Sequence, residues 1–202
     1  MITHYTNDFN DYLKKFKEKF KEYFEKYNSQ KDNPLFNKNP YQDFYDDVIK
    51  KLQTHTLECP HCAHKGHFIK YGTYKRSIKT PFGMVQIRIQ RYMCKNCGHT
   101  HALLLSSIIP YSQLLIGDAL KIIRATTADE YKEIMCNNLC IDESTISMTR
   151  YQFKKHWKER LCAAQIQLDD EDLIFKCFFH YNRQFMQIRR IKNKLYINTN
   201  TA

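Results

Sequence analysis

Four cysteines, arranged as two C-x-x-C pairs, are the residues of this chain with the clearest capacity for chemistry. The first pair lies in the segment Cys-Pro-His-Cys and the second in Cys-Lys-Asn-Cys-Gly. A C-x-x-C turn can direct two thiolates toward one point, and two such turns complete a tetrahedral site of four sulfurs, which suits zinc. The spacing therefore predicts a zinc ion (Zn2+) with the ligands Cys59, Cys62, Cys94 and Cys97.

The alternatives for these pairs are a redox dithiol and structural disulfides. A redox C-x-x-C normally stands alone near a βαβ pattern, which this sequence lacks. Disulfides need an oxidising compartment, and nothing at the N-terminus resembles a signal peptide, so we expect a cytoplasmic protein. Five nearby histidines could each replace a cysteine, but we expect them at the surface or around the ligands: His61, His64, His67, His99 and His101. The other cysteines are expected to be buried thiols, namely Cys136, Cys140, Cys162 and Cys177.

The stretch between the two pairs must bring them together, and its pattern predicts a β-hairpin. Strand-forming residues follow the first pair, and Pro81 and Gly83 suit a tight turn. From Val85 to Tyr92 the residues alternate as in a half-buried strand, with Arg91 on the apolar face and Tyr92 on the polar face. We therefore interpret residues 57–101 as a zinc ribbon.

The preceding segment, residues 1–55, is expected to contain helices and a linker. Aromatic residues recur at intervals of three and four between Thr6 and Asn28, which predicts an amphipathic helix. This helix packs on the rest of the protein or forms a homodimer, and its interspersed acids argue against a membrane surface. No apolar run is long enough to span a membrane, so no membrane partner is expected. Residues 29–40 read as a linker, and Tyr41 to Leu52 as a short helix.

Residues 112–160 have the pattern of a helix-turn-helix domain. A first helix is expected from Ser112 to Arg124, with Leu115, Ala119, Leu120 and Ile123 as its inward residues. A capping box at Thr127 starts the second helix, and Asp142 caps the third. Between these helices Asn137 and Asn138 are expected in the left-handed conformation.

The third helix of this domain is the one expected to read DNA. Ile146, Phe153 and Trp157 share a core-facing side. Hydrogen-bonding and cationic residues occupy the remaining surface, as base-edge and phosphate contacts require. The DNA-binding residues expected here are Ser144, Ser147, Met148, Tyr151, Lys154 and Lys155.

Charge supports a polyanionic partner, for which we favour double-stranded DNA, with RNA as the alternative. The chain carries a formal net charge of +11. Residues 57–101 contain eight basic residues and one acidic residue, and residues 144–160 contain five basic residues and one acidic residue. Residues 118–143 have the opposite balance, with three basic and six acidic residues. Such concentrated basic charge is typical of nucleic-acid binding. The ribbon residues expected to contact DNA are Lys75, Arg76, Lys79 and Arg88.

Residues 161–202 are expected to form one or two further helices and a basic tail. Leu173, Phe175, Cys177 and Phe178 should pack inward. From Arg183 to Lys194 the chain has five basic residues and no acid. This tail is interpreted as either a phosphate-contacting arm or a solvated end.

Several of these motifs resemble an uncharacterised group of small, transposon-associated Firmicutes proteins. The resemblance lies in the Cys-Pro-His-Cys segment, in residues 71–76, 91–104 and 109–112, and in residues 183–190. More distantly, a zinc ribbon followed by a helix-turn-helix is similar to the N-terminal DNA-binding part of insertion-sequence transposases. The resemblance implies DNA binding in a mobile-element context.

The sequence departs from those transposases in its acidic residues. Their cleavage domain carries separated Asp, Asp and Glu residues that hold two metal ions. Here the acids after the helix-turn-helix are Glu159 and the cluster from Asp169 to Asp172. A site of four thiolates is also closed to water, and glycine is too scarce for a phosphate-binding loop. We therefore expect a binding protein and not an enzyme.

Taken together, the sequence predicts an α+β fold: a small β-hairpin zinc ribbon, then a helix-turn-helix domain, with an amphipathic helix at the N-terminus. The predicted function is zinc-dependent, sequence-specific DNA binding in a mobile element or in transcription, without a catalytic domain. The alternative is a zinc-ribbon adaptor for protein–protein interaction, with the N-terminal aromatic helix as its contact.

Overall fold

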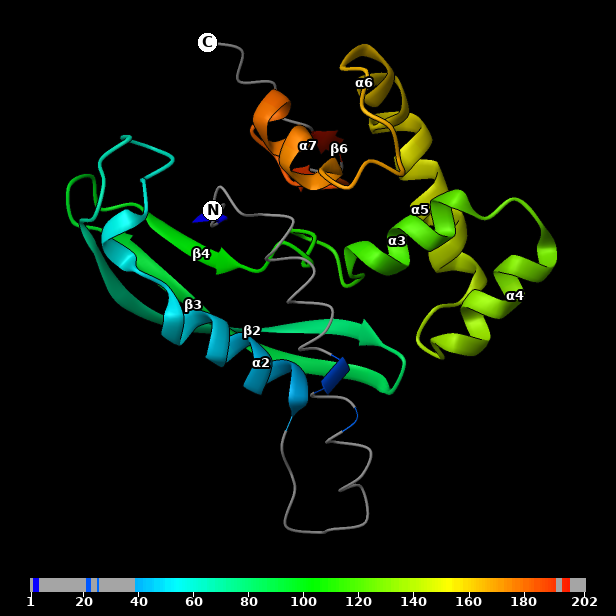
Figure 1. The fold of residues 1–202 in the computed structure, drawn as a ribbon, viewed down its shortest axis with the longest axis horizontal. Helices are drawn as coiled ribbons and strands as arrows, with labels where there is room; N and C mark the ends of the chain where they lie inside the picture. Colours follow the sequence, from blue (N-terminus) through cyan, green and yellow to red (C-terminus); the bar gives the residue numbers. More distant parts are fainter. Residues whose placement is uncertain (1, 4–20, 23–24, 26–38, 192–193, 197–202) are drawn as a thin grey trace, which may run out of the picture. The chain divides into compact units, whose positions relative to one another are not determined.

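Helices and a small sheet make up the part of the chain that the computed structural model describes, which confirms the α+β class (Figure 1). The described residues are 2–3, 21–22, 25, 39–191 and 194–196. The chain divides into two compact units, the first formed by residues 1–76 and 86–105 and the second by residues 77–85 and 106–202. The predicted N-terminal helix and linker lie outside the described residues, except that Lys21, Glu22 and Glu25 are helical and Asn39 and Pro40 begin the next helix.

A four-stranded sheet of order β1-β4-β3-β2 contains the predicted hairpin. Its strands are β1 (Ile2–Thr3), β2 (Phe68–Thr80), β3 (Gly83–Cys94) and β4 (Thr100–Leu104). At the hairpin turn Thr80 Oγ1 accepts a hydrogen bond from the amide of Phe82 at 3.3 Å, and Gly83 has a φ of +116°. Strand β4 pairs antiparallel to β3 and parallel to β1. Strand β4 was not predicted from the sequence.

Helix α2 (Pro40–Lys51) packs on the sheet of the first unit. The Asn39 side chain caps it by accepting the amides of Tyr41 and Gln42. Buried Tyr45 joins the helix to two strands, since its hydroxyl donates to the carbonyl of Leu103 at 2.9 Å and accepts the amide of Gln90 at 2.8 Å. Burial raises the pKa of this phenol well above its ordinary value.

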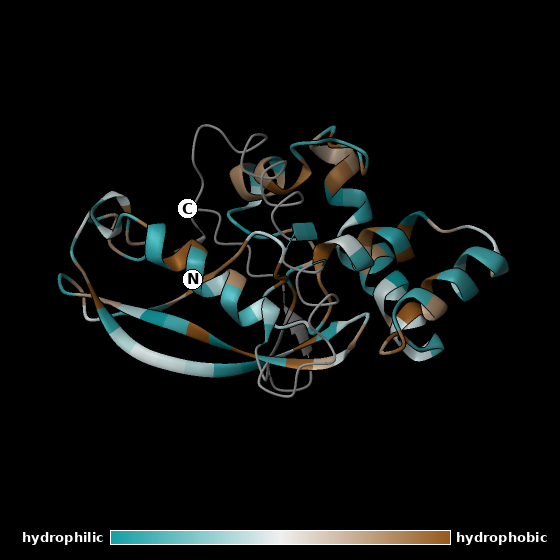
Figure 2. Cartoon of the chain, turned by 60° about the horizontal axis from the view of Figure 1, so that its bottom comes forward, coloured by the Kyte–Doolittle hydropathy of each residue, from teal (hydrophilic) through white to brown (hydrophobic). Residues whose placement is uncertain are grey.

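Buried or half-buried residues alternate with exposed ones along β3 as far as Ile89, and the alternation is lost after that residue. Figure 2 shows hydrophilic and hydrophobic residues following one another along the strands of this sheet. Tyr92, expected on the polar face, is 3% exposed and forms a small core with Leu57 and Leu103. Arg91, expected on the apolar face, is half-buried and lies over the ring of Tyr71, with 5.5 Å from guanidinium carbon to ring centroid. The expected positions of Arg91 and Tyr92 were therefore wrong, because apolar residues from outside the hairpin, Leu57 and Leu103, pack against Tyr92.

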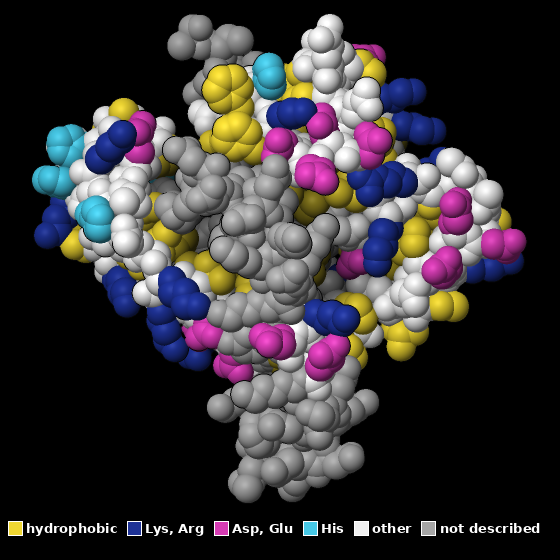
Figure 3. Space-filling model, in the orientation of Figure 1, with side chains coloured by type: hydrophobic (Ala, Val, Ile, Leu, Met, Phe, Trp, Pro, Cys, Tyr) yellow, Lys and Arg dark blue, Asp and Glu magenta, His cyan; other side chains and the backbone are white. Residues whose placement is uncertain are grey.

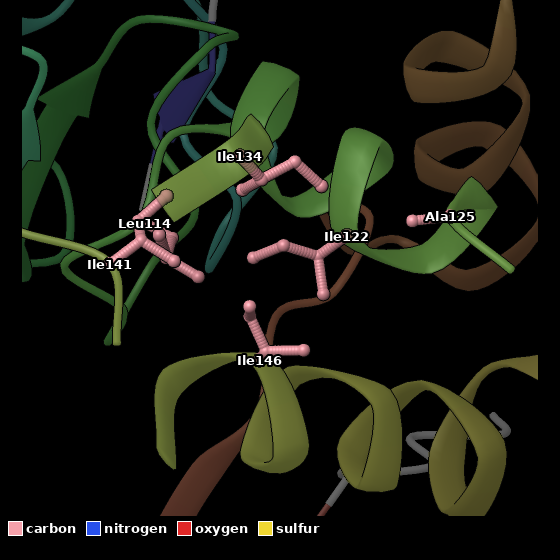
Figure 4. Packing of buried hydrophobic residues seen from close by; sticks show 6 residues of the cluster. All are labelled: Leu114, Ile122, Ala125, Ile134, Ile141 and Ile146. Atoms are coloured by element: carbon pink, nitrogen blue, oxygen red, sulfur yellow. The ribbon is translucent and has the colours of Figure 1, made fainter. Parts of the chain in front are cut away.

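Three helices form the centre of the second unit: α3 (Ile116–Arg124), α4 (Ala128–Asn137) and α5 (Glu143–His156). Their caps agree with the sequence. Thr127 and Glu130 form the capping box of α4, and the Asp142 carboxylate accepts the amide of Thr145 at 2.7 Å at the start of α5. The side chains of the apolar core converge from all three helices and their connections (Figure 4): Leu114, Ile122, Ala125, Ile134, Ile141 and Ile146.

Two expectations for these helices were wrong. Helix α3 starts at Ile116 and not at Ser112, and it buries Ile116, Ala119 and Ile122, while Leu115, Leu120 and Ile123 are only half-buried. Asn138 is extended, with a φ of −143°, and not left-handed. Its side chain closes the turn instead, because Nδ2 donates to Asp118 at 3.1 Å and Oδ1 accepts the amide of Cys140 at 3.1 Å.

The remaining described elements are α6 (Lys158–Ala163), α7 (Leu173–Tyr181), β5 (Arg189–Ile191) and β6 (Lys194–Tyr196). Residues 184–188 are buried, and Phe185 packs against Trp157 with ring centroids 5.4 Å apart. This part of the basic tail is therefore neither a free arm nor a solvated end. In α7 Phe175 was expected to pack inward but is exposed, as is Phe179, whereas Ile174 is buried. None of the described helices has the length and apolar character that crossing a bilayer requires.

The expectation of four buried thiols outside the C-x-x-C pairs holds only for Cys177. Cys136 and Cys162 are exposed, and Cys140 is half-buried. Burial raises the pKa of the Cys177 thiol to about 12. Cys136 lies on α4 and Cys162 on α6, whereas Cys140 lies in the turn between α4 and α5.

We expect Ile122→Ala to lower the free energy of unfolding of the second unit by about 2–5 kcal/mol, because the side chain is fully buried between three helices. Trp157 is the single tryptophan of the chain and is fully buried in this unit. Its fluorescence during urea unfolding therefore reports on the unfolding of the second unit. Ile123→Ala, at a half-buried neighbour on the same helix, is the control and should cost markedly less. Equal losses in the two variants would contradict the assigned core.

Candidate metal centre and nucleic-acid interface

The sulfurs of Cys59, Cys62, Cys94 and Cys97 converge, with all four Sγ atoms within 4.8 Å of one another. Cys59 and Cys97 Sγ are 3.6 Å apart, and Cys62 and Cys94 Sγ are 3.7 Å apart. The members of each of these close contacts come from opposite turns. The four residues could hold a metal ion, with the Cys59 and Cys94 side chains buried and the other two half-buried.

The two cysteine turns have the same backbone geometry. In the first, the Cys59 amide donates to the His64 carbonyl at 2.9 Å, and the Ala63 amide donates to the Cys59 carbonyl at 2.8 Å. In the second, the Cys94 amide donates to the His99 carbonyl at 2.9 Å, and the Gly98 amide donates to the Cys94 carbonyl at 2.8 Å. The residue four positions after the first cysteine is left-handed in both turns, with a φ of 56° at Ala63 and 73° at Gly98. The amide of Lys95 also donates to the carbonyl of His67 at 2.7 Å, which ties the second turn to the start of β2.

Polar groups surround the sulfurs. Asn96 Nδ2 donates to Cys62 Sγ at 3.5 Å, and this bond together with the amide of His64 lowers the pKa of Cys62 to about 6. The His99 amide lowers the pKa of Cys97, but desolvation and the three neighbouring sulfurs outweigh it and raise that pKa to about 12. Without a cation, the crowded thiols therefore resist ionising together. A bound metal ion would supply the positive charge that lets all four become thiolates.

The five nearby histidines differ in position. His101 is buried, and its Nε2 lies 3.4 Å from Cys59 Sγ, so it lies directly behind a ligand. Burial lowers the pKa of His101 to about 4. The other four are exposed: His61, His64, His67 and His99. Figure 3 shows exposed histidines grouped with lysine and arginine side chains at this end of the first unit. The special position of His101 has no signal in the sequence, because strand β4 that carries it was not predicted.

On α5, all six residues expected to contact DNA are exposed: Ser144, Ser147, Met148, Tyr151, Lys154 and Lys155. The opposite side of the helix is held by buried Ile146, Thr149 and, at its C-terminal end, Trp157. Tyr151 and Lys155 are one turn apart and interact, since Lys155 Nζ donates to the Tyr151 hydroxyl at 2.8 Å. The helix thus presents a continuous face of hydroxyl, thioether and ammonium groups.

The four basic residues expected on the hairpin have different environments. Lys75 and Arg88 are exposed, and Arg76 is half-buried. Lys79 is half-buried at the hairpin tip in the second unit, where its Nζ donates to Thr145 Oγ1 at 2.6 Å. Since Thr145 Oγ1 in turn donates to the capping carboxylate of Asp142 at 2.5 Å, Lys79 supports the start of α5.

The molecule is therefore a mixed α and β protein with a four-cysteine cluster capable of holding a metal ion. Over residues 59–151 it is similar to a family described as a domain of unknown function (DUF6431). The matched stretch is just under half of the 202 residues, and it runs from the first clustered cysteine into α5. No curated protein and no solved structure matches the chain.

We expect the purified protein to bind one Co2+ ion tightly through the four cysteines, with the sulfur-to-cobalt charge-transfer absorption of a four-thiolate site. Cys97→Ser should weaken Co2+ binding by more than about tenfold. Substituting a residue that only hydrogen-bonds to a metal ligand already lowers metal affinity by about ten- to a hundredfold, and Cys97 is expected to be a ligand itself. Cys136→Ser removes an exposed thiol outside the cluster and is the matched control. An unchanged spectrum in Cys97→Ser would show that the cluster does not bind the ion.

The backbone of the second turn gives a further expectation. In Gly98→Ala the new Cβ would meet no atom within 4 Å, so the cost is the left-handed conformation alone, about 1–2 kcal/mol. Because folding of the turn is coupled to metal binding, Co2+ affinity should fall about five- to thirtyfold. Ala63→Gly makes the opposite change at the equivalent position and should leave the affinity unchanged or raise it slightly. Competition with a chelator measures both, and a Gly98→Ala protein with full affinity would contradict the coupling.

Proposed function

We propose that this protein is a zinc-dependent, sequence-specific DNA-binding protein that acts in a mobile element or in transcription in the cytoplasm, and that it binds DNA without cleaving it. The observation that carries the proposal is the exposed face of α5. Its residues are not needed for packing, yet they have the chemistry of base-edge and phosphate contacts.

Zinc is the metal that the sulfur cluster supports best. A zinc ion 2.3 Å from four tetrahedral thiolates would hold the sulfurs about 3.8 Å apart. The separations of 3.6 and 3.7 Å across the two turns agree with this value. The residues that would hold the ion are Cys59, Cys62, Cys94 and Cys97, on two turns of the kind found in zinc ribbons. Four thiolates leave no position for water, so the role of the ion would be to stabilise the fold.

The arrangement of α4 and α5 supports a helix-turn-helix interpretation. The two helices are joined by residues 138–142, whose turn is closed by the buried side chain of Asn138. The core cluster fixes the inner side of α5 through Ile146. In helix-turn-helix proteins the N-terminal part of the second helix contacts base edges. The residues in that position here are Ser144, Ser147 and Met148, and Lys154 and Lys155 follow as phosphate contacts.

Basic residues of the hairpin would supply further phosphate contacts, namely Lys75, Arg76 and Arg88. Such contacts carry little sequence information and make affinity strongly dependent on salt. Lys79 would act through the fold, because its ammonium group bonds to Thr145 at the start of α5. We assign it to the support of the recognition helix.

Selection from a randomised duplex DNA pool by zinc-loaded protein at near-physiological salt tests the proposal. An enriched motif is the expected result. Recovery of DNA without a motif would contradict sequence-specific recognition and leave electrostatic binding alone. Recovery of no DNA would overturn the proposal in favour of RNA or of the protein-interaction adaptor.

The selected site then allows substitutions on α5 to be compared. Lys155→Ala should weaken binding to all duplexes similarly and lower the salt-dependence slope by about one, because one phosphate contact is lost. Ser147→Ala or Tyr151→Ala should instead change the preferred sequence. Lys132→Ala removes the same charge from the exposed surface of α4, where Lys132 pairs with Asp129 at 3.1 Å, and should have little effect. Fluorescence anisotropy with the selected and scrambled duplexes measures these effects, and equal losses for Lys155→Ala and Lys132→Ala would contradict the assigned interface.

A further inference from the structure

A second group of metal-ligand side chains lies beside the four sulfurs and shares one of them. Ligand atoms of His61, Cys97 and His99 all lie within 4.8 Å of one another. The rings of His61 and His99 stack with centroids 3.5 Å apart and planes inclined by 18°, although both side chains are exposed. An imidazole binds an ion through the lone pair in its ring plane, so these exposed rings would rotate about their side-chain torsions to share one ion. The two histidines come from different cysteine turns. The approach of these turns, which places the four sulfurs together, therefore also places the two rings side by side.

The hydrogen bonding of His99 prepares one of its nitrogens for a metal ion. Its Nδ1 lies 3.2 Å from the carbonyl oxygen of Cys97. A carbonyl oxygen can only accept a hydrogen bond, so Nδ1 carries the proton in this contact and Nε2 keeps its lone pair. A backbone carbonyl is one of the usual hydrogen-bond partners of the ring nitrogen that does not bind the ion in a metal-ligating histidine.

Cys97 is the cysteine best placed to serve two ions. Its side chain is half-buried, as is that of Cys62, but among the four clustered cysteines only Cys97 also belongs to the group with His61 and His99. A thiolate has lone pairs for two metal ions, and four thiolates around one divalent ion retain a net charge of about −2, which attracts a second cation. Two imidazoles and a thiolate are suitable ligands for borderline ions such as zinc and cobalt.

We propose that His61, His99 and Cys97 form an accessory site for a second divalent ion of the zinc class, with Cys97 Sγ bridging the two ions. The inference rests on occupation of the four-sulfur site, which belongs to the proposed function. The accessory site has three protein ligands, so its fourth position is open to water or to an oxygen of a bound anion. Its ion is expected to bind more weakly than the first, because its histidine ligands are exposed and it has one protein ligand fewer.

The test is a titration of the full-length protein with the cadmium isotope 113Cd, followed by 113Cd NMR. The first equivalent should give one resonance typical of four sulfur ligands. The second equivalent should give another resonance, typical of mixed nitrogen and sulfur ligands. Scalar coupling between the two cadmium nuclei is expected, because a shared sulfur connects them.

Substitutions locate the second ion. His61→Ala and His99→Ala should each abolish the second resonance and the coupling while the first resonance remains. His64→Ala and His67→Ala are the matched controls and should keep both resonances, because these exposed rings pair with each other, with centroids 4.6 Å apart, and belong to neither metal-ligand group.

The outcomes separate this inference from the proposed function. Absence of the first resonance overturns the four-sulfur site and this inference with it. A first resonance without a second overturns the accessory site alone. A second resonance that persists in His61→Ala and His99→Ala, or that shows no coupling, would place the ion elsewhere and overturn the bridging role of Cys97.

Discussion

The convergence of four sulfur atoms is the constraint that brings the two cysteine turns of the first unit together. The apolar core of this unit includes Leu57, Tyr92 and Leu103, and Phe44, Tyr45, Ile87 and Ile89 are buried there as well. The two cysteine turns are separated by the full length of the hairpin, so a bound ion would fix the pairing of β2 with β3 as well as the turns. Structural zinc sites contribute about 10–16 kcal/mol of binding free energy to folding, so an ion held here would add substantially to the stability of the unit.

The second unit is stabilised by an apolar core and capped helices. The exposed residues of α5 are not part of that core, so their chemistry bears on binding. Its apolar core, its capped helices and the contact of Trp157 with Phe185 are sufficient to position α5. The exposed side of that helix contributes nothing to this packing. Folding alone would therefore tolerate almost any polar residues there, and the choice of hydroxyl, aromatic and ammonium groups is better explained by a binding partner.

The parts of the fold that local chemistry determines were predictable from the sequence. The hairpin turn at Pro81, the capping box at Thr127 and the cap at Asp142 each depend on a few neighbouring residues, and the cysteine spacing led to the cluster. The wrong predictions concern parts of the fold that depend on contacts between residues far apart in the sequence. Strand β4 forms because β3 and β1 pair with it, and residues 184–188 are buried because the core of the second unit covers them. The exposed face of α5 follows from helical periodicity, but the position of His101 behind Cys59 could not be predicted without β4.

In the proposed function, affinity and specificity belong to separately stabilised units. The hairpin residues Lys75, Arg76 and Arg88 lie in the unit that contains the sulfur cluster, and they would supply phosphate contacts. The α5 residues lie in the unit that depends on an apolar core, and they offer base contacts. A metal ion would then control mainly the electrostatic part of binding, which is the part most sensitive to salt. An ion in the accessory histidine site would also strengthen the electrostatic part of binding. Four thiolates and one divalent ion leave a net negative charge in an otherwise basic module, and a second cation would offset it.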